Sequence, residues 1–102
     1  MTLEGFHALI VDLRKRKFPL GQVVITSNAQ QTIAPAEVSE ALARHAGGDW
    51  GELCKEDRQL NENSLKEGGR LLSAYAAKDS TKFWIVTEAD RSVTTVLLPE
   101  DY

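Results

Sequence analysis

The sequence has one cysteine, three prolines and one methionine, and it lacks long hydrophobic runs. Because Cys54 is alone, no disulfide can form within the chain, and we expect a reducing, cytoplasmic setting. The longest apolar runs reach four residues, as at 8–11. A membrane-spanning helix needs about 20 such residues. The sequence therefore predicts no membrane span and no membrane partner.

Metal ligands and catalytic motifs are also scarce. His7, His45 and Cys54 lie too far apart in the sequence to form a recognisable metal set, so we expect no metal centre. No Walker, Rossmann or nucleophile-elbow motif occurs, and no cofactor is expected. The net charge is −3, whereas proteins that hold nucleic acid by bulk charge usually present a basic face. The composition therefore argues against nucleic acid as a partner.

The residues that are present indicate one α+β domain over 1–102. A content of 42% hydrophobic and 26% charged residues is ordinary for a globular protein. Apolar residues recur at helical spacing over 3–17, and β-branched residues predict a short strand over 22–26. A polar loop is expected over 27–31. Two further helices follow, from 35 to the glycine pair at 47–48 and from 55 to 67.

The last third alternates apolar and polar residues in the manner of strands. Three strands are expected, over 70–76, 82–88 and 93–98, separated by short polar turns. Short connections favour antiparallel pairing. The prediction is a three-stranded antiparallel meander with the helices packed on one face of the sheet. Phe83 and Ile85 are expected on the helix-covered face, with their strand in the centre.

Two segments carry a resemblance to a known family: Gly48-Asp49-Trp50-Gly51, and residues 87–102 with the sequence TEADRSVTTVLLPEDY. They resemble a family of short uncharacterised bacterial proteins met on plasmids and other mobile elements. The resemblance runs from about Gly21 to Tyr102. It implies a bacterial cytoplasmic protein in a mobile-element setting, and it brings no activity with it.

A second resemblance is one of element order. A strand, two helices and a three-stranded meander are similar to the RelE/ParE toxin fold and to small ribonucleases built like it. This resemblance implies endoribonuclease activity as an alternative function. His45, Glu88 and Arg91 are the residues that could carry it, with Glu88 as general base and Arg91 as phosphate-binding cation. Alternatively, 87–91 is only a hairpin turn, in which Asp90 bonds the backbone and Arg91 pairs with Glu88 or Asp90.

Three candidate contact regions remain. Trp50 is either an exposed anchor for a partner or the buried centre of a turn between helices, with Gly51 at a positive φ. Asp90 and Arg91 are candidates for partner contacts as well. The basic run Arg14-Lys15-Arg16-Lys17 either contacts phosphates or complements the dipole at the end of the first helix.

Taken together, these features favour a small non-enzymatic accessory protein of a bacterial mobile element. It is expected to act through contacts with a protein partner that the sequence does not identify, with a homodimer as one option. The first alternative is the RelE-like endoribonuclease built on His45, Glu88 and Arg91. The second is a regulator that binds nucleic acid through Arg14, Lys15, Arg16 and Lys17.

Overall fold

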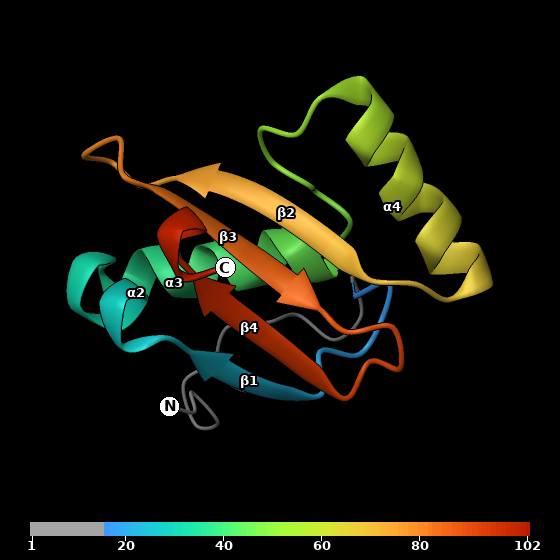
Figure 1. Ribbon diagram of the computed structural model, residues 1–102, viewed down its shortest axis with the longest axis horizontal. Helices are drawn as coiled ribbons and strands as arrows, with labels where there is room; N and C mark the ends of the chain where they lie inside the picture. The colour runs from blue at the N-terminus through green and yellow to red at the C-terminus, as the bar shows by residue number, and fades with distance from the viewer. Residues whose placement is uncertain (1–15) are drawn as a thin grey trace.

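The computed structural model describes residues 16–102, which form an α+β structure around a mixed sheet (Figure 1). The helix expected over 3–17 falls almost wholly outside the described residues. Arg16 and Lys17, its last two positions, are not helical.

Eight elements follow in order along the described chain. They are β1 (Gln22–Ile25), α2 (Ser27–Thr32), α3 (Pro35–Ala46), α4 (Lys55–Glu67), β2 (Leu71–Ala76), β3 (Lys82–Thr87), β4 (Val93–Leu97) and the short 3-10 helix η1 (Pro99–Asp101). The predictions of α3, α4 and the strands are confirmed to within about one residue at each end, which is the usual uncertainty of such bounds.

The polar loop expected over 27–31 is instead the helix α2, so that prediction was wrong. Thr26 precedes the helix, and its hydroxyl accepts a hydrogen bond from the amide of Ala29 at 3.2 Å. A threonine at this position satisfies a backbone donor that a helix start otherwise leaves free. Ala29 itself is fully buried. The helix has six residues, of which only one is buried, so its sequence shows no repeat of apolar residues at helical spacing.

The sheet has four strands in the order β1-β4-β3-β2. The antiparallel pairs β2–β3 and β3–β4 are those expected, with β3 inside the sheet. The first strand, however, joins β4 in parallel, with Gln22 opposite Val93. The three-stranded sheet predicted from the sequence was therefore incomplete. A parallel partner requires a long crossover, and local alternation carries no signal for it.

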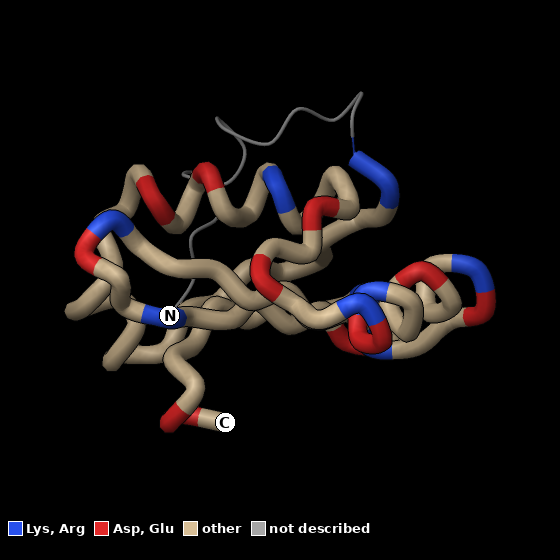
Figure 2. The backbone as a smooth tube through the Cα atoms, turned by 90° about the horizontal axis from the view of Figure 1, so that it is seen from above, with Lys and Arg blue, Asp and Glu red and all other residues tan. Residues whose placement is uncertain are grey.

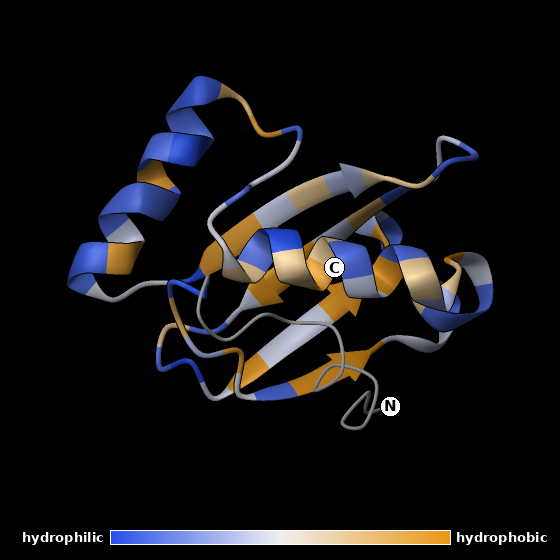
Figure 3. Ribbon diagram, turned by 180° about the vertical axis from the view of Figure 1, so that it is seen from behind, coloured by the Kyte–Doolittle hydropathy of each residue, from blue (hydrophilic) through white to orange (hydrophobic). Residues whose placement is uncertain are grey.

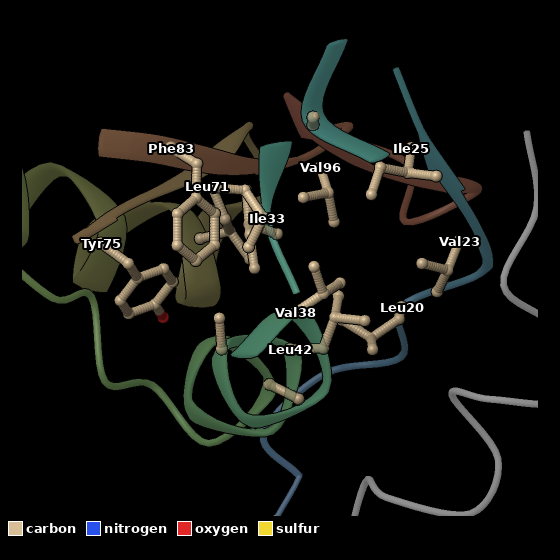
Figure 4. Close-up of a cluster of buried hydrophobic side chains, with 14 of the residues drawn as sticks. Leu20, Val23, Ile25, Ile33, Val38, Leu42, Leu71, Tyr75, Phe83 and Val96 are labelled. Atoms are coloured by element: carbon tan, nitrogen blue, oxygen red, sulfur yellow. The ribbon is translucent and has the colours of Figure 1, made fainter. Parts of the chain in front are cut away.

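Helix α3 covers one face of this sheet. Its buried side chains meet buried side chains of all four strands, and the close-up in Figure 4 shows Val38 and Leu42 turned toward the strands. Phe83 and Ile85 are 2% and 0% exposed on this face, so their prediction is confirmed. Figure 3 shows the hydrophilic residues of α3 on the side turned away from the sheet.

Helix α4 lies beside the outer edge of β2 and not over the face with α3 (Figures 1 and 2). The carboxamide of Asn61 donates to the carbonyl of Leu72 at 2.6 Å and accepts from its amide at 3.1 Å. The carbonyl of Trp50 and the amide of Glu52 bond Ala74 on the same edge. The expectation that all helices share one face was wrong, because the outward backbone groups of Leu72 and Ala74 hold α4 and the loop before it at this edge.

Candidate functional site

Trp50 is buried in the core and offers no exposed ring to a partner. Only 4% of its surface is exposed, its indole N–H donates to the carboxylate of Glu62 at 2.8 Å, and its ring stacks on Phe18. The neighbouring Gly51 has a φ of +75°, and a Cβ there would come within 2.0 Å of the Ala74 carbonyl oxygen. This segment is thus a tight turn that closes onto β2.

Arg91 acts as a clamp between the hairpin after β3 and the end of α4. Its guanidinium donates to the backbone carbonyls of Gly69, Glu88, Ala89 and Ser64, at 2.6 to 3.1 Å. Arg91 has a φ of 62°, which is uncommon for a residue other than glycine. These contacts engage the cation in holding backbone, so it is not presented to a phosphate.

The two acidic residues of this turn are engaged separately. The carboxylate of Glu88 pairs with Arg70 at 3.3 Å, and both side chains remain partly exposed. Asp90 accepts from the hydroxyl and the amide of Ser92, and these bonds lower its pKa. Asp90 therefore supports the turn in the way expected of an aspartate at this position.

His45 is completely buried and bonded at both ring nitrogens. Nδ1 lies 2.6 Å from the hydroxyl of Ser73, and Nε2 lies 2.9 Å from that of Thr87. Thr87 in turn lies 2.7 Å from the hydroxyl of Thr94, which donates to the carbonyl of Leu20 at 2.6 Å. This chain of polar groups links α3 to three strands inside an otherwise apolar core.

The direction of every proton in this chain follows from its last member. A carbonyl only accepts, so the single proton of Thr94 goes to Leu20. Thr87 must then donate to Thr94, and the Nε2–H of His45 must donate to Thr87. In the neutral imidazole Nδ1 is consequently the acceptor, and the hydroxyl of Ser73 donates to it.

Burial, together with the positive charge of Arg91, lowers the pKa of His45 to about 3. His45 is therefore neutral at ordinary pH and out of reach of any substrate. The structure does not bring His45, Glu88 and Arg91 together at an accessible surface: the first is enclosed, the second pairs with Arg70, and the third clamps backbone.

The basic run is only partly described. Arg14 and Lys15 lie outside the described residues. The backbone amide of Lys17 donates to the carbonyl of Ala46, and its side chain passes over Gly48. This places the end of the run beside the end of α3.

The opposite face of the sheet is not covered by α3, and it is partly exposed: Leu72 and Trp84 are half-buried, whereas Val86 is only 4% exposed. In Figure 1 this face points toward the viewer, and within the described chain only η1 lies in front of it. Along β3 the residues on this face are Lys82, Trp84, Val86 and, just beyond the strand, Glu88. Leu72 and Ala74 lie beside them on β2. We call this surface the open face.

Two shallow hollows mark the open face. One has a volume of about 320 Å³ and is lined by Arg70, Leu72, Trp84, Val86 and Tyr102. The other, of about 200 Å³, extends toward β4 and reaches Glu88, Thr95 and Leu97. Tyr102 borders both: its ring meets Trp84 edge-on at 5.6 Å, and its hydroxyl accepts from Arg70 at 2.9 Å. This bond contributes most to raising the pKa of Arg70.

The turn that carries Tyr102 is fixed by Asp101. Its carboxylate accepts from the hydroxyl of Thr26, from the side-chain amide of Asn28 and from the backbone amide of Leu98. These bonds lower the pKa of Asp101, with Thr26 contributing most. The turn that lies in front of the open face is therefore tied to the start of α2.

Sequence reasoning did not select the residues of the open face, although a signal was present. Lys82, Trp84, Val86 and Glu88 occur at every second position, so they share one side of a strand. What the sequence could not show is that α4 lies at the sheet edge and leaves this side to η1 alone among the described elements.

Two absences apply to the described part of the chain. No helix in residues 16–102 is long and apolar enough to cross a membrane. Nor do three or more His, Cys, Asp or Glu side chains in this range gather closely enough to hold a metal ion.

Comparisons with known proteins add no relative. No family model matches the chain, and neither a curated protein nor a solved structure resembles it significantly.

Proposed function

We propose that this chain is a small binding module that acts through protein–protein contacts on its open face. In keeping with the resemblance of residues 48–51 and 87–102, its setting is the bacterial cytoplasm, as an accessory protein of a mobile element. The observation that carries the proposal is the hollow lined by Leu72, Trp84 and Tyr102 over the buried Val86, which none of the described elements except η1 covers.

The composition of this surface fits a protein partner. Aromatic residues are enriched in the buried centres of protein interfaces, and charged residues are usual at their rims. Here Trp84 occupies the centre, while Lys82 and Glu88 stand at the two ends of the same strand. The platform is also rigid, because β3 is paired on both sides and backed by α3. A preorganised surface loses little entropy on binding.

Site-directed photo-crosslinking tests this proposal. A photoreactive phenylalanine derivative replaces Leu72 on the open face, and a matched control carries it at Glu40, an exposed position of α3. We expect a discrete protein adduct from position 72 in bacterial cells. When the crosslinking is repeated in a cell extract, excess purified unlabelled chain added before irradiation should suppress the adduct. A Trp84→Asp chain added in the same excess should not suppress it. Failure to form an adduct at 72, or equal labelling from 40, would contradict the proposal.

A further inference from the structure

On the basis of the proposed function, we infer that the hollow beside Trp84 receives an aromatic side chain of the protein partner, and that Arg70 pairs with a carboxylate next to it. This hollow, lined by Arg70, Leu72, Trp84, Val86 and Tyr102, is called the Trp84 hollow. One side chain entering it needs neither a broad contact over the sheet nor an exposed Val86, and η1 can stay in place. The partner segment is thus an aromatic residue with an acidic neighbour.

The size of the Trp84 hollow fits one aromatic ring. Its volume is about 320 Å³, whereas an apolar cavity of about 150 Å³ already holds benzene. The rest of the volume suits the carbons that join a ring to its backbone. Val86 is 4% exposed, and Leu72 and Trp84 are half-buried, so apolar surface around the hollow still meets water. Covering this surface with a ring favours association.

Tyr102 shows how this surface accepts an aromatic ring from an acidic segment. Its two preceding residues are Glu100 and Asp101. Its ring meets Trp84 edge-on at 5.6 Å, and the guanidinium carbon of Arg70 lies 5.7 Å from its ring centre. Because Tyr102 is 71% exposed, its ring does not fill the hollow that it borders. A second ring there extends the aromatic pair at the spacing of about 4.5–7 Å that such rings prefer.

Among the described residues, Arg70 is the one charged side chain that lines the Trp84 hollow. Its guanidinium carries several N–H donors in one plane. One donates to the hydroxyl of Tyr102 at 2.9 Å, and another donates to the carboxylate of Glu88 at 3.3 Å. The side chain is 50% exposed, so the remaining donors can meet a carboxylate that arrives from solvent. The planar fork matches a carboxylate through parallel hydrogen bonds.

The acidic residues near Arg70 border the other hollow. Glu88 and Asp101 both line that hollow, and neither lines the Trp84 hollow. Asp101 is held in place by three hydrogen bonds. The pair between Arg70 and Glu88 is partly exposed, and such pairs contribute little to stability. Arg70 can therefore turn donors toward a partner carboxylate at small cost, and the Trp84 hollow favours an anion over a cation.

Two-dimensional NMR with capped tripeptides tests the inference. The probe contains aspartate, phenylalanine and glycine; one control peptide has lysine in place of the aspartate, and another has alanine in place of the phenylalanine. We expect the probe to bind with a dissociation constant of roughly 1 mM and to shift the indole N–H signal of Trp84. The indole of Trp50, which is buried and bonded to Glu62, should not shift. Both control peptides should bind at least about tenfold more weakly.

Variants of the chain locate the two contacts. Arg70→Gln should bind the probe at least about tenfold more weakly and should no longer distinguish it from the lysine peptide. Arg58→Gln is the matched control, because Arg58 is exposed on α4 away from the hollow, and its loss should leave the affinity unchanged. Leu72→Asp, read at the same indole signal, should abolish binding. The amide spectrum of each variant checks its fold.

Three results would each overturn the inference. The first is a probe that leaves the signal of Trp84 in place. The second is a lysine peptide that binds as tightly as the probe. The third is an equal affinity of the Arg70→Gln and Arg58→Gln chains for the probe.

The crosslinking experiment distinguishes this inference from the function on which it rests. An adduct from position 72, together with binding of the acidic aromatic probe, supports both. An adduct without any binding of the probe overturns the acidic aromatic partner and leaves the binding module intact. The absence of any adduct contradicts both, because the hollow then meets no partner.

Discussion

The Nε2 of His45 lies 2.9 Å from the hydroxyl of Thr87, a group that has no proton left to give it. Thr87 must donate to Thr94, whose own proton is bound to the carbonyl of Leu20. One backbone carbonyl thereby fixes the tautomer of an imidazole on another element. A second proton on the ring would have to enter at Nδ1, where the hydroxyl of Ser73 now donates.

The first prediction concerns the pH dependence of stability. The pKa of His45 is about 3 in the folded protein and near 6.5 in the unfolded chain, so between these values the unfolded chain binds a proton that the folded one excludes. The free energy of unfolding should therefore fall as pH falls below 6.5, by about 1.4 kcal/mol per pH unit. Above pH 6.5 this contribution is constant.

Urea denaturation at pH 7.5 and pH 5.0 measures this effect, with an expected loss of about 2 kcal/mol at the lower pH. The window lies above the usual titration range of carboxylates. His45→Asn removes the titrating ring and should lose most of the slope. A wild type equally stable at both pH values would contradict the buried neutral histidine.

The second prediction concerns the core. Ile85→Ala should lower the free energy of unfolding by roughly 2–5 kcal/mol, because a fully buried side chain on an interior strand leaves a cavity. Leu60→Ala is the matched control: Leu60 is 62% exposed, and its loss should change stability by less than about 0.5 kcal/mol. Equal denaturation midpoints for the two variants would show that Ile85 does not support the core.

The third prediction concerns the clamp at Arg91. Arg91→Lys keeps the charge but cannot reproduce the planar fork that contacts four carbonyls. We expect a loss of about 1–3 kcal/mol. Hydrogen exchange should accelerate most at the end of α4, where Ser64 loses its partner. Unchanged exchange in α4 would show that these contacts do not hold the helix in place.

The fourth prediction concerns catalysis. We expect the purified protein to leave RNA uncleaved, because His45 is enclosed and neutral and Arg91 is engaged by backbone. The assay compares the wild type with Glu88→Gln and Arg91→Ala on messenger RNA in vitro, together with growth after induction. Cleavage by the wild type that both variants lose would establish the endoribonuclease alternative in place of the binding module.

Local sequence patterns predicted which segments form helices and strands, but not which of these elements pack against one another. The helical period from Pro35 and the alternation along β3 each lie within one segment, so the sequence displays them directly. The parallel pairing of β1 with β4 and the docking of Asn61 on Leu72 depend on groups far apart in the chain. No local pattern encodes such a contact.

The candidate site divides in the same way. The alternation of Trp84 and Val86 was visible in the sequence, yet the partial exposure of Trp84 depends on where α4 lies. The sequence also singled out Trp50 and Arg91, but their roles follow from their contacts in the structure. Trp50 donates to Glu62, and Arg91 donates to the carbonyls of four residues. Residue type identified groups able to bind, and tertiary contacts decided which of them are already engaged.

The pairing of β1 with β4 also bears on how the protein is made. Thr26 and Asp101 are hydrogen-bonded although they are 75 residues apart in the sequence. The contacts of β1 can therefore be completed only after β4 and Asp101 have been synthesised. On a ribosome, β1 emerges early and can complete its pairing only after β4 has been synthesised. The hairpins of β2, β3 and β4 are local and can form first, whereas closure by β1 requires a large loop. We therefore expect β1 to be incorporated only after β4 has left the ribosome, as the late step of folding.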